Sequence, residues 1–125
     1  MIEFTNAKKV AGMLAAVGEP TRMLILYRLA QRPHHVGQLA ELIGIPMVNM
    51  SHHLGVMRQA GLLDDEKDGR RVVYKFRPEI FSPGTGDVLG TLSLGMYRLT
   101  MVKTNGTALP ARPRRRSVRK LKAVT

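Results

Sequence analysis

The chain has 125 residues, a net charge of +11 and no cysteine, which excludes disulfides and thiolate metal sites. One domain of this length with 44% hydrophobic residues can bury a compact core, which must be aliphatic because only 5% of the residues are aromatic. The N-terminal sequence lacks the apolar core of a signal peptide and no stretch is long enough to span a bilayer, so we expect a cytoplasmic protein without membrane association.

Two helices are predicted before residue 34. The first spans residues 4–17 and ends at Gly18, with an apolar stripe formed by Phe4, Ala7, Ala11 and Leu14. The second begins at Pro20 and runs to about Gln31, where Pro33 stops it. Its apolar residues lie on more than one side and are Met23, Leu24, Leu26, Tyr27 and Ala30. We therefore expect this helix to be central and buried.

A short helix, a tight turn and another helix follow. The short helix spans residues 36–43, with Val36, Leu39, Ala40 and Ile43 facing inward. After the turn at residues 44–46, the next helix begins at Pro46, runs to about Ala60 and is capped by Gly61. Its core-facing residues are spaced i, i+4, i+7 and are Met50, Leu54 and Met57. This order is typical of a helix-turn-helix.

The opposite face of this helix is small and polar, as a surface in a DNA major groove needs to be. It carries Val48, Ser51, His52 and Gly55. Asn49, Ser51 and His52 can hydrogen-bond base edges or phosphates, and Met47 or Val48 can contact a thymine methyl group. An ordinary amphipathic helix with polar residues toward solvent is the alternative. Only the preceding helix and turn make the DNA-binding interpretation the better one.

A charged hairpin comes next and resembles the wing of a winged helix. Leu62 and Leu63 begin an extended segment, Asp68-Gly69 is a hairpin-turn signal, and residues 72–76 form the return strand. The basic side chains near the turn can reach phosphates or a minor groove and are Lys67, Arg70 and Arg71. Four acidic residues among them weaken the local positive field, which favours Arg70 and Arg71 as the contacts. The alternative is a solvent-facing charged hairpin.

The C-terminal part is predicted to hold a last helix and a basic tail. Asp87 can cap a helix that runs to about Lys103, with one face formed by Leu89, Leu92, Met96 and Leu99. We therefore expect one domain over residues 1–105 and a tail, disordered in isolation, over residues 106–125. Residues 107–125 contain seven basic and no acidic residues, which leaves +4 for the rest. A polyanion is the natural partner for this charge, and a solubilising tail is the alternative.

Three segments together resemble the ArsR/SmtB family of bacterial winged-helix repressors over residues 10–76. They read EPTRMLILYRLA, VGQLAELIGIPMVNMSHHLGVMRQAGLL and DGRRVVYKF. The resemblance implies a mainly α fold with a small β-hairpin, a winged helix-turn-helix. It also implies a homodimer that binds a pseudo-palindromic operator in double-stranded DNA and represses a promoter until an inducer binds.

The resemblance also assigns residues to roles. The positions that read bases are Met47, Val48, Asn49, Ser51 and His52, and the wing contributes Arg70 and Arg71, with Lys67 beside them. The dimer interface consists of the first and last helices, through Phe4, Ala7, Ala11, Leu14, Leu89, Leu92, Met96 and Leu99. Family members more often have Gln, Ser and Thr where Met47, Val48 and Asn49 stand. This departure predicts an unusual operator preference.

The common metal-sensing patterns of the family are missing. Many relatives carry Cys-x-Cys in the third helix, where this chain has His35 and Gly37, and others carry Asp-x-His on the last helix, where Asp87 is followed by Leu89. Adjacent His52 and His53 point about 100° apart on a helix and chelate poorly. We place His34 and His35 in a surface loop and expect no metal, no cofactor and an unidentified inducer. A metal site formed by His34, His35 and a partner's carboxylate is the alternative. Met23, Met50, Met57 and Met96 are best explained as core residues, although Met96 and Met101 could instead form a dimer surface or a ligand pocket.

Three classes of function can be weighed on these residues. The first is a sequence-specific, homodimeric transcriptional repressor released by a signal that is not a metal. The alternative is a non-specific nucleic-acid-binding or nucleoid-type protein driven by the basic tail. The third is an enzyme, which the sequence does not support: it has no Gly-rich phosphate loop, no cysteine nucleophile and no carboxylate pair beside a histidine.

Overall fold

The computed structural model describes residues 2–104. The helices are α1 (Ile2–Val17), α2 (Pro20–Gln31), α3 (Val36–Ile43) and α4 (Met47–Gln59). The strands are β1 (His34–His35), β2 (Leu63–Asp68), β3 (Arg71–Phe76), β4 (Phe81–Pro83), β5 (Val88–Leu94) and β6 (Tyr97–Val102). The predicted basic tail, residues 106–125, lies outside the described residues. No helix in the described part is long and apolar enough to cross a membrane.

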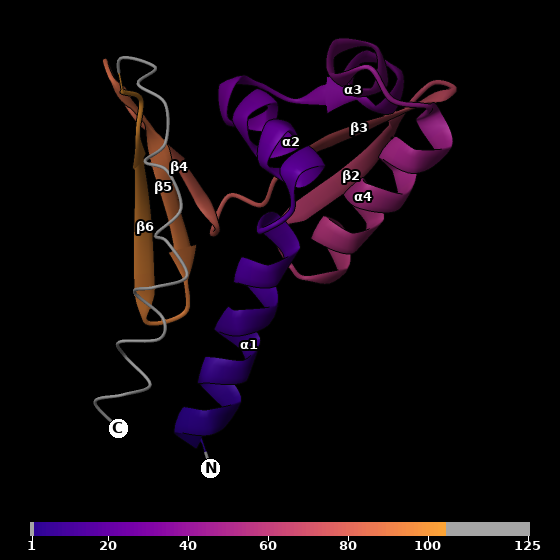
Figure 1. Cartoon of the computed structure of the whole chain (residues 1–125). Coiled ribbons are helices and arrows are strands. Elements are labelled where there is room, and N and C mark those ends of the chain that lie inside the picture. The colour runs from indigo at the N-terminus through magenta and orange to yellow at the C-terminus, as the bar shows by residue number, and fades with distance from the viewer. Residues whose placement is uncertain (1, 105–125) are drawn as a thin grey trace, which may run out of the picture.

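The strands form two antiparallel sheets of three strands each, in the orders β1-β3-β2 and β4-β5-β6. Figure 1 shows the first sheet beside α3 and α4, where the hairpin of β2 and β3 is the predicted wing. The second sheet stands on the other side of the helices and packs on α2.

The helix-turn-helix and wing agree closely with the sequence prediction. Helix α3 has the predicted bounds, and α4 differs from them by one residue at each end. The predicted inward residues of α4 are completely buried and are Met50, Leu54 and Met57. The spacing of apolar residues sufficed here because each helix buries one continuous stripe against the core.

The first two helices leave more apolar surface exposed than the sequence pattern predicts. Helix α1 buries Val10, Met13, Ala16 and Val17. The predicted stripe of α1 lies on a neighbouring face and is exposed, with Phe4 and Leu14 its largest members. The prediction that α2 is central and buried is correct for one side only: Ile25, Leu26 and Leu29 are buried, whereas Met23, Leu24 and Tyr27 are exposed. The rest of the described chain covers only one side of this helix.

The predicted C-terminal helix is wrong, because residues 88–102 form the β5–β6 hairpin. The four residues predicted to line its interface do not form one exposed surface: Leu92 is buried in the core and Leu89 is half-buried beside a β-bulge. Met96 lies 74% exposed in the turn, and Leu99 is 41% exposed. Interaction through a C-terminal helix is therefore not available to the described chain.

Local chemistry explains why this segment is β rather than helical. Gly90, Leu92 and Leu94 alternate inward along β5, which is the period of a strand. Gly95 occupies the first central position of the turn with φ +64. The second position, Met96, has a negative φ, because no non-glycine residue of the described chain has a positive φ. This combination is that of a type II′ hairpin turn, which favours glycine at its first central position. Spacings of three and four residues between apolar side chains thus fit this hairpin by coincidence.

A glycine also lets the second sheet join the core. The rings of Phe76 on β3 and Phe81 on β4 stack with centroids 4.6 Å apart. A Cβ atom at Gly90 would lie 2.2 Å from Cζ of Phe81 and 2.8 Å from the carbonyl oxygen of Ser82. The absence of a side chain at position 90 therefore allows the Phe81 ring to reach its stacking partner.

We predict that Gly90→Ala destabilises the fold by roughly 1–3 kcal/mol, the usual cost of overpacking a core. Chemical denaturation measures it. The matched control is Gly12→Ala in exposed α1, where a Cβ meets nothing within 4 Å. This control should be neutral or stabilise by up to about 1 kcal/mol, because alanine favours a helix. Equal effects of the two substitutions would contradict the packing explanation.

Candidate nucleic-acid interface

Helix α4 is oriented by its buried side. It begins after Pro46, whose carbonyl accepts a 3.0 Å hydrogen bond from the backbone N–H of Met50. Because Met50, Leu54 and Met57 point into the core, helical geometry directs the intervening residues outward. All five predicted base-reading residues are exposed and are Met47, Val48, Asn49, Ser51 and His52. Val48 is the extreme case, 81% exposed.

The wing projects beside this helix as a two-stranded hairpin. Its strands pair from Leu63 with Phe76 at the base to Asp68 with Arg71 at the tip. Only Leu63 of β2 is buried, so the outer part of the hairpin extends into solvent, as Figure 1 shows. Lys67, Arg70 and Arg71, the predicted wing contacts, are all exposed.

Helix α4 and the wing meet at a groove of about 540 Å³. It is lined by α4 through Met47 and Ser51, and by the wing through Arg70 and Arg71. The rest of the lining is Val36, Gly37, Gln38 and Glu41 of α3 and Val72 of β3. Four of the eight predicted contact residues therefore come together. The other four lie outside this groove, namely Val48, Asn49, His52 and Lys67.

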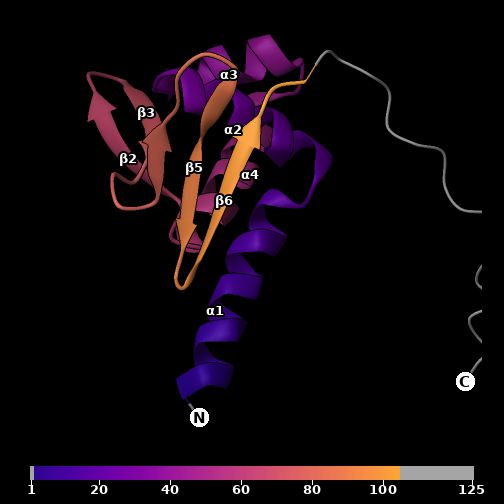
Figure 2. The ribbon, with the colours of Figure 1, turned by 90° about the vertical axis from the view of Figure 1, so that its left-hand side faces the viewer.

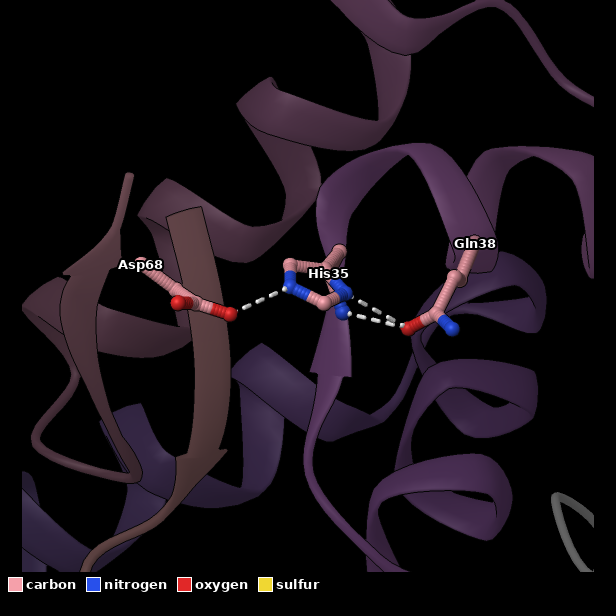
Figure 3. A network of polar contacts seen from close by, with 3 residues as sticks. All are labelled: His35, Gln38 and Asp68. Atoms are coloured by element: carbon pink, nitrogen blue, oxygen red, sulfur yellow. Dashed lines mark hydrogen bonds and ion pairs between the residues drawn. The ribbon is translucent and has the colours of Figure 1, made fainter. Parts of the chain in front are cut away.

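A polar network connects the wing tip to the start of α3, as Figure 3 shows. Nε2 of His35 lies 3.1 Å from Oδ2 of Asp68. Oε1 of Gln38 accepts a 2.9 Å hydrogen bond from the backbone N–H of His35 and lies 3.0 Å from its Nδ1. The two ring nitrogens of His35 therefore face oxygens from two different elements, Gln38 of α3 and Asp68 of the wing. Sequence reasoning missed this network, although Gln three residues after the helix cap is a capping signal.

The two adjacent histidines of α4 have different environments. His52 is exposed, whereas His53 turns toward α2 and is half-buried. Nδ1 of His53 lies 3.1 Å from Nη1 of Arg22 and 3.5 Å from Oε2 of Glu19. Nε of Arg22 also donates to the carbonyl oxygen of Ala16. These contacts tie the middle of α4 to the α1–α2 junction.

Glu19 caps α2 and belongs to the same cluster. Its carboxylate accepts a 3.0 Å hydrogen bond from the backbone N–H of Arg22. Desolvation raises the pKa of Glu19, but hydrogen bonds from the backbone N–H groups of Thr21 and Arg22 and the positive charges of His53 and Arg22 outweigh it and leave the pKa below its ordinary value. The charged carboxylate is therefore the favoured form.

The prediction that His34 lies in a surface loop is wrong. It pairs with Tyr74 as part of β1, is 3% exposed, and its Nδ1 lies 2.8 Å from the carbonyl oxygen of Arg32. Burial lowers the pKa of His34, and the nearby charges of Arg32, Arg28 and His35 lower it further, against an opposing effect of the Arg32 hydrogen bond. No local sequence signal indicates this burial, because the pairing of β1 with β3 joins residues about 40 positions apart.

Residues 2–104 contain no group of three His, Cys, Asp or Glu side chains that could hold a metal ion. Besides the carboxylates of Glu41 and Asp68, this side of the described chain presents amide, hydroxyl, imidazole and guanidinium groups. These are the groups that contact bases and phosphates in protein–DNA complexes.

Comparison with known proteins matches this arrangement. The profile of bacterial regulatory proteins of the arsR family matches residues 19–65. The HTH-type transcriptional regulator YgaV of Escherichia coli (strain K12) is 35% identical over 75 residues, which cover 59% of this chain and 76% of YgaV. The nodulation protein NolR of Rhizobium meliloti is 32% identical over 88 residues, covering 70% of this chain and 69% of NolR.

Solved structures of similar proteins share the fold. The homodimeric winged helix-turn-helix DNA-binding domain Mb0332 from Mycobacterium bovis matches with a TM-score of 0.57 and 26% identity, covering 59% of this chain and 68% of that one. NolR from Sinorhizobium fredii matches with a TM-score of 0.56 and 30% identity, covering 62% and 77%.

We predict that His34 makes the fold less stable as the pH falls. Its pKa is lower in the folded than in the unfolded chain, so its contribution is complete above about pH 6.5 and is lost as the pH drops toward the folded-state pKa. The loss is at most about 1.4 kcal/mol per pH unit. Urea denaturation between pH 8 and pH 5 should show a shallower pH dependence for His34→Gln, whereas the exposed control His52→Gln should keep the wild-type slope. Equal slopes for all three proteins would contradict this role.

Proposed function

The chain belongs to the ArsR family of bacterial regulatory proteins, and on this premise we propose that it is a homodimeric repressor that binds a pseudo-palindromic operator in double-stranded DNA. The family is one of DNA-binding transcriptional regulators and not of enzymes. The observation that carries the proposal is the groove in which Met47 and Ser51 of α4 face Arg70 and Arg71 of the wing.

The side chains divide between reading bases and holding phosphates. Asn49, Ser51 and His52 are exposed at the start of α4, the part of a recognition helix that meets base edges in the major groove. Met47 and Val48 offer apolar contact to thymine methyl groups. The guanidinium groups of the wing suit phosphates or a narrow minor groove, where they position the protein on the duplex.

Two copies are needed to read a palindrome. Each copy supplies one recognition helix, and half-sites of such dimers lie about 34 Å apart, one turn of DNA. The exposed stripe of α1 is one candidate part of the dimer interface and consists of Phe4, Ala7, Ala11 and Leu14. Similarity to a homodimeric winged helix-turn-helix domain supports this proposal.

Two further parts of the proposal concern the inducer that releases the repressor from DNA and the basic tail, residues 106–125. We infer a signal other than a metal ion, because the chain has no cysteine and carries neither common metal-sensing pattern of the family. We also propose that residues 106–125 act as a basic arm that lengthens the DNA footprint, supported by the seven basic residues after position 106. A regulator of this kind acts where bacterial DNA is, in the cytoplasm.

We predict that the wing arginines contribute affinity and the α4 residues contribute specificity. Once genomic selection has defined an operator, Arg70→Ala or Arg71→Ala should weaken binding to all sequences and reduce the salt slope by about 0.9 for each phosphate that is no longer neutralised. Asn49→Ala or Ser51→Ala should instead lower discrimination between the operator and its point variants, by about 1–3 kcal/mol where the side chain hydrogen-bonds a base. Fluorescence anisotropy titrations at several salt concentrations measure both quantities.

Lys8→Ala is the matched control, because this exposed lysine lies on α1, which extends away from the wing in Figure 1. It should change neither affinity nor salt slope. Bound genomic fragments that share no sequence would overturn the proposal in favour of non-specific binding. Complete loss of binding on removal of residues 107–125 would do the same.

A further inference from the structure

The two edges of the second sheet differ in how they are protected. Strand β4 is three residues long and ends in Pro83, which has no N–H to offer a partner strand. Strand β6 is six residues long, contains no proline and has only one charged residue, Arg98. Its exposed apolar side chains are Tyr97, Leu99 and Val102, at 58%, 41% and 57%. A long apolar edge of this kind invites pairing with another strand.

The hairpin geometry determines which backbone groups face outward. In a two-residue hairpin, the residues beside the turn exchange hydrogen bonds, so Tyr97 bonds to Leu94 and Leu99 to Leu92. The alternate residues Arg98, Thr100 and Val102 then direct their N–H and C=O groups away from β5. The 3.0 Å contact between the hydroxyls of Thr91 and Thr100 fits this phase, because side chains approach closest at pairs without backbone hydrogen bonds.

One face of β6 continues the buried face of β5. Leu99 lies opposite Leu92 and Tyr97 opposite Leu94, so these pairs share a face of the sheet. Leu92 and Leu94 are buried beneath the helices, whereas their partners on β6 remain exposed. Figure 2 shows β6 at the edge of the sheet, with no other strand of the described chain beyond it. The apolar layer under the sheet therefore ends with β6 uncovered.

We propose that β6 pairs antiparallel with β6 of a second copy, so that two three-stranded sheets become one sheet of six strands. This inference rests on the proposed function, since an operator-binding site is incomplete with one recognition helix. A strand that pairs with its own copy across a two-fold axis satisfies the outward N–H and C=O groups of both copies. In this dimer, the pairing of the two β6 strands takes the place of the contact that the C-terminal helix was expected to make.

Symmetry and charge limit the register. Residues that pair directly must point to the same face of the sheet. The two-fold axis therefore lies midway between the two copies of one β6 residue, which pairs with itself. An axis at Arg98 would set two guanidinium groups directly opposite each other, which is unfavourable. An axis at Leu99 or Thr100 avoids this and covers Leu99 with an apolar residue of the partner.

Because α2 packs on the face that carries Leu92, its exposed Met23 and Leu24 then lie on the same side of the sheet as the partner's helices.

Disulfide trapping tests this pairing directly, because the chain has no cysteine of its own. Leu99→Cys and Thr100→Cys each place one thiol at a candidate axis, where symmetry-related Cβ atoms would lie within about 5.5 Å. Ser82→Cys, on the exposed edge strand β4, is the matched control. Under mild oxidation of the full-length protein, at least one β6 variant should form a disulfide-linked dimer that still binds the operator, while the Ser82 variant stays mostly unlinked. Equal linking of all three variants would overturn the proposal.

A second variant tests the edge without a cross-link. Thr100→Pro removes an outward N–H but no backbone hydrogen bond to β5, and it loses the hydroxyl contact with Thr91, as Thr100→Val also does. The chain should therefore keep its circular dichroism while the dimer dissociation constant rises about tenfold or more. Thr100→Val, which keeps the N–H, is the control and should dimerise like wild type. Sedimentation equilibrium gives both constants. A folded Thr100→Pro protein with unchanged dimerisation would overturn the proposal.

Hydrogen exchange separates a second copy from a later part of the same chain. Protection of the Thr100 amide should increase with protein concentration if a second copy covers the edge. Full protection of the Thr100 amide at concentrations where sedimentation shows only monomers would assign the edge to the same chain and overturn the proposal. A dimer trapped through β6 that binds no operator would count against the proposed function alone. Operator binding by a dimer with an unpaired β6 would count against this inference alone.

Discussion

The buried side of α4 determines which of its residues can form a surface for DNA. Met50, Leu54 and Met57 are completely buried, and a helix held by three consecutive turns cannot rotate without exposing them. The residues between them are therefore held toward solvent, where Ser51 meets the groove beside the wing. The contact between His35, the residue before α3, and Asp68 joins the start of α3 to the wing tip. Core packing and a polar contact thus shape the candidate DNA-binding surface together.

The elements that could be predicted from the sequence are those whose signals are local. The helix-turn-helix and the wing follow from apolar spacing, Gly44, Pro46 and the Asp68-Gly69 turn. The β5–β6 hairpin does not follow from apolar spacing, because leucines three and four residues apart fit a helix as well. Gly90 and Gly95 were the better evidence, one making room for Phe81 and the other forming the turn. Contacts between distant residues, such as those of β1 with β3, had no sequence signal.

Replacement of a C-terminal helix by a sheet changes how two DNA-binding surfaces could be related. A helix is a self-contained element, whereas an edge strand has unpaired backbone groups that only another strand can satisfy. The exposed apolar residues of α1, α2 and β6 show that the described part of one copy does not cover its own apolar surface. The family relationship accounts for the helix-turn-helix and wing, and the second sheet is the feature in which this chain departs from the expected arrangement.

The most direct test of the DNA-binding surface is a map of backbone amide chemical shifts before and after addition of operator DNA. If α4 and the wing contact the duplex together, the largest changes fall on the exposed residues of α4 and on residues 67–71 of the wing, while the buried Met50, Leu54 and Met57 change less. The exposed residues of α4 are Met47, Val48, Asn49, Ser51 and His52. Changes confined to α1 or to residues after position 104, with α4 and the wing unmoved, would contradict this assignment.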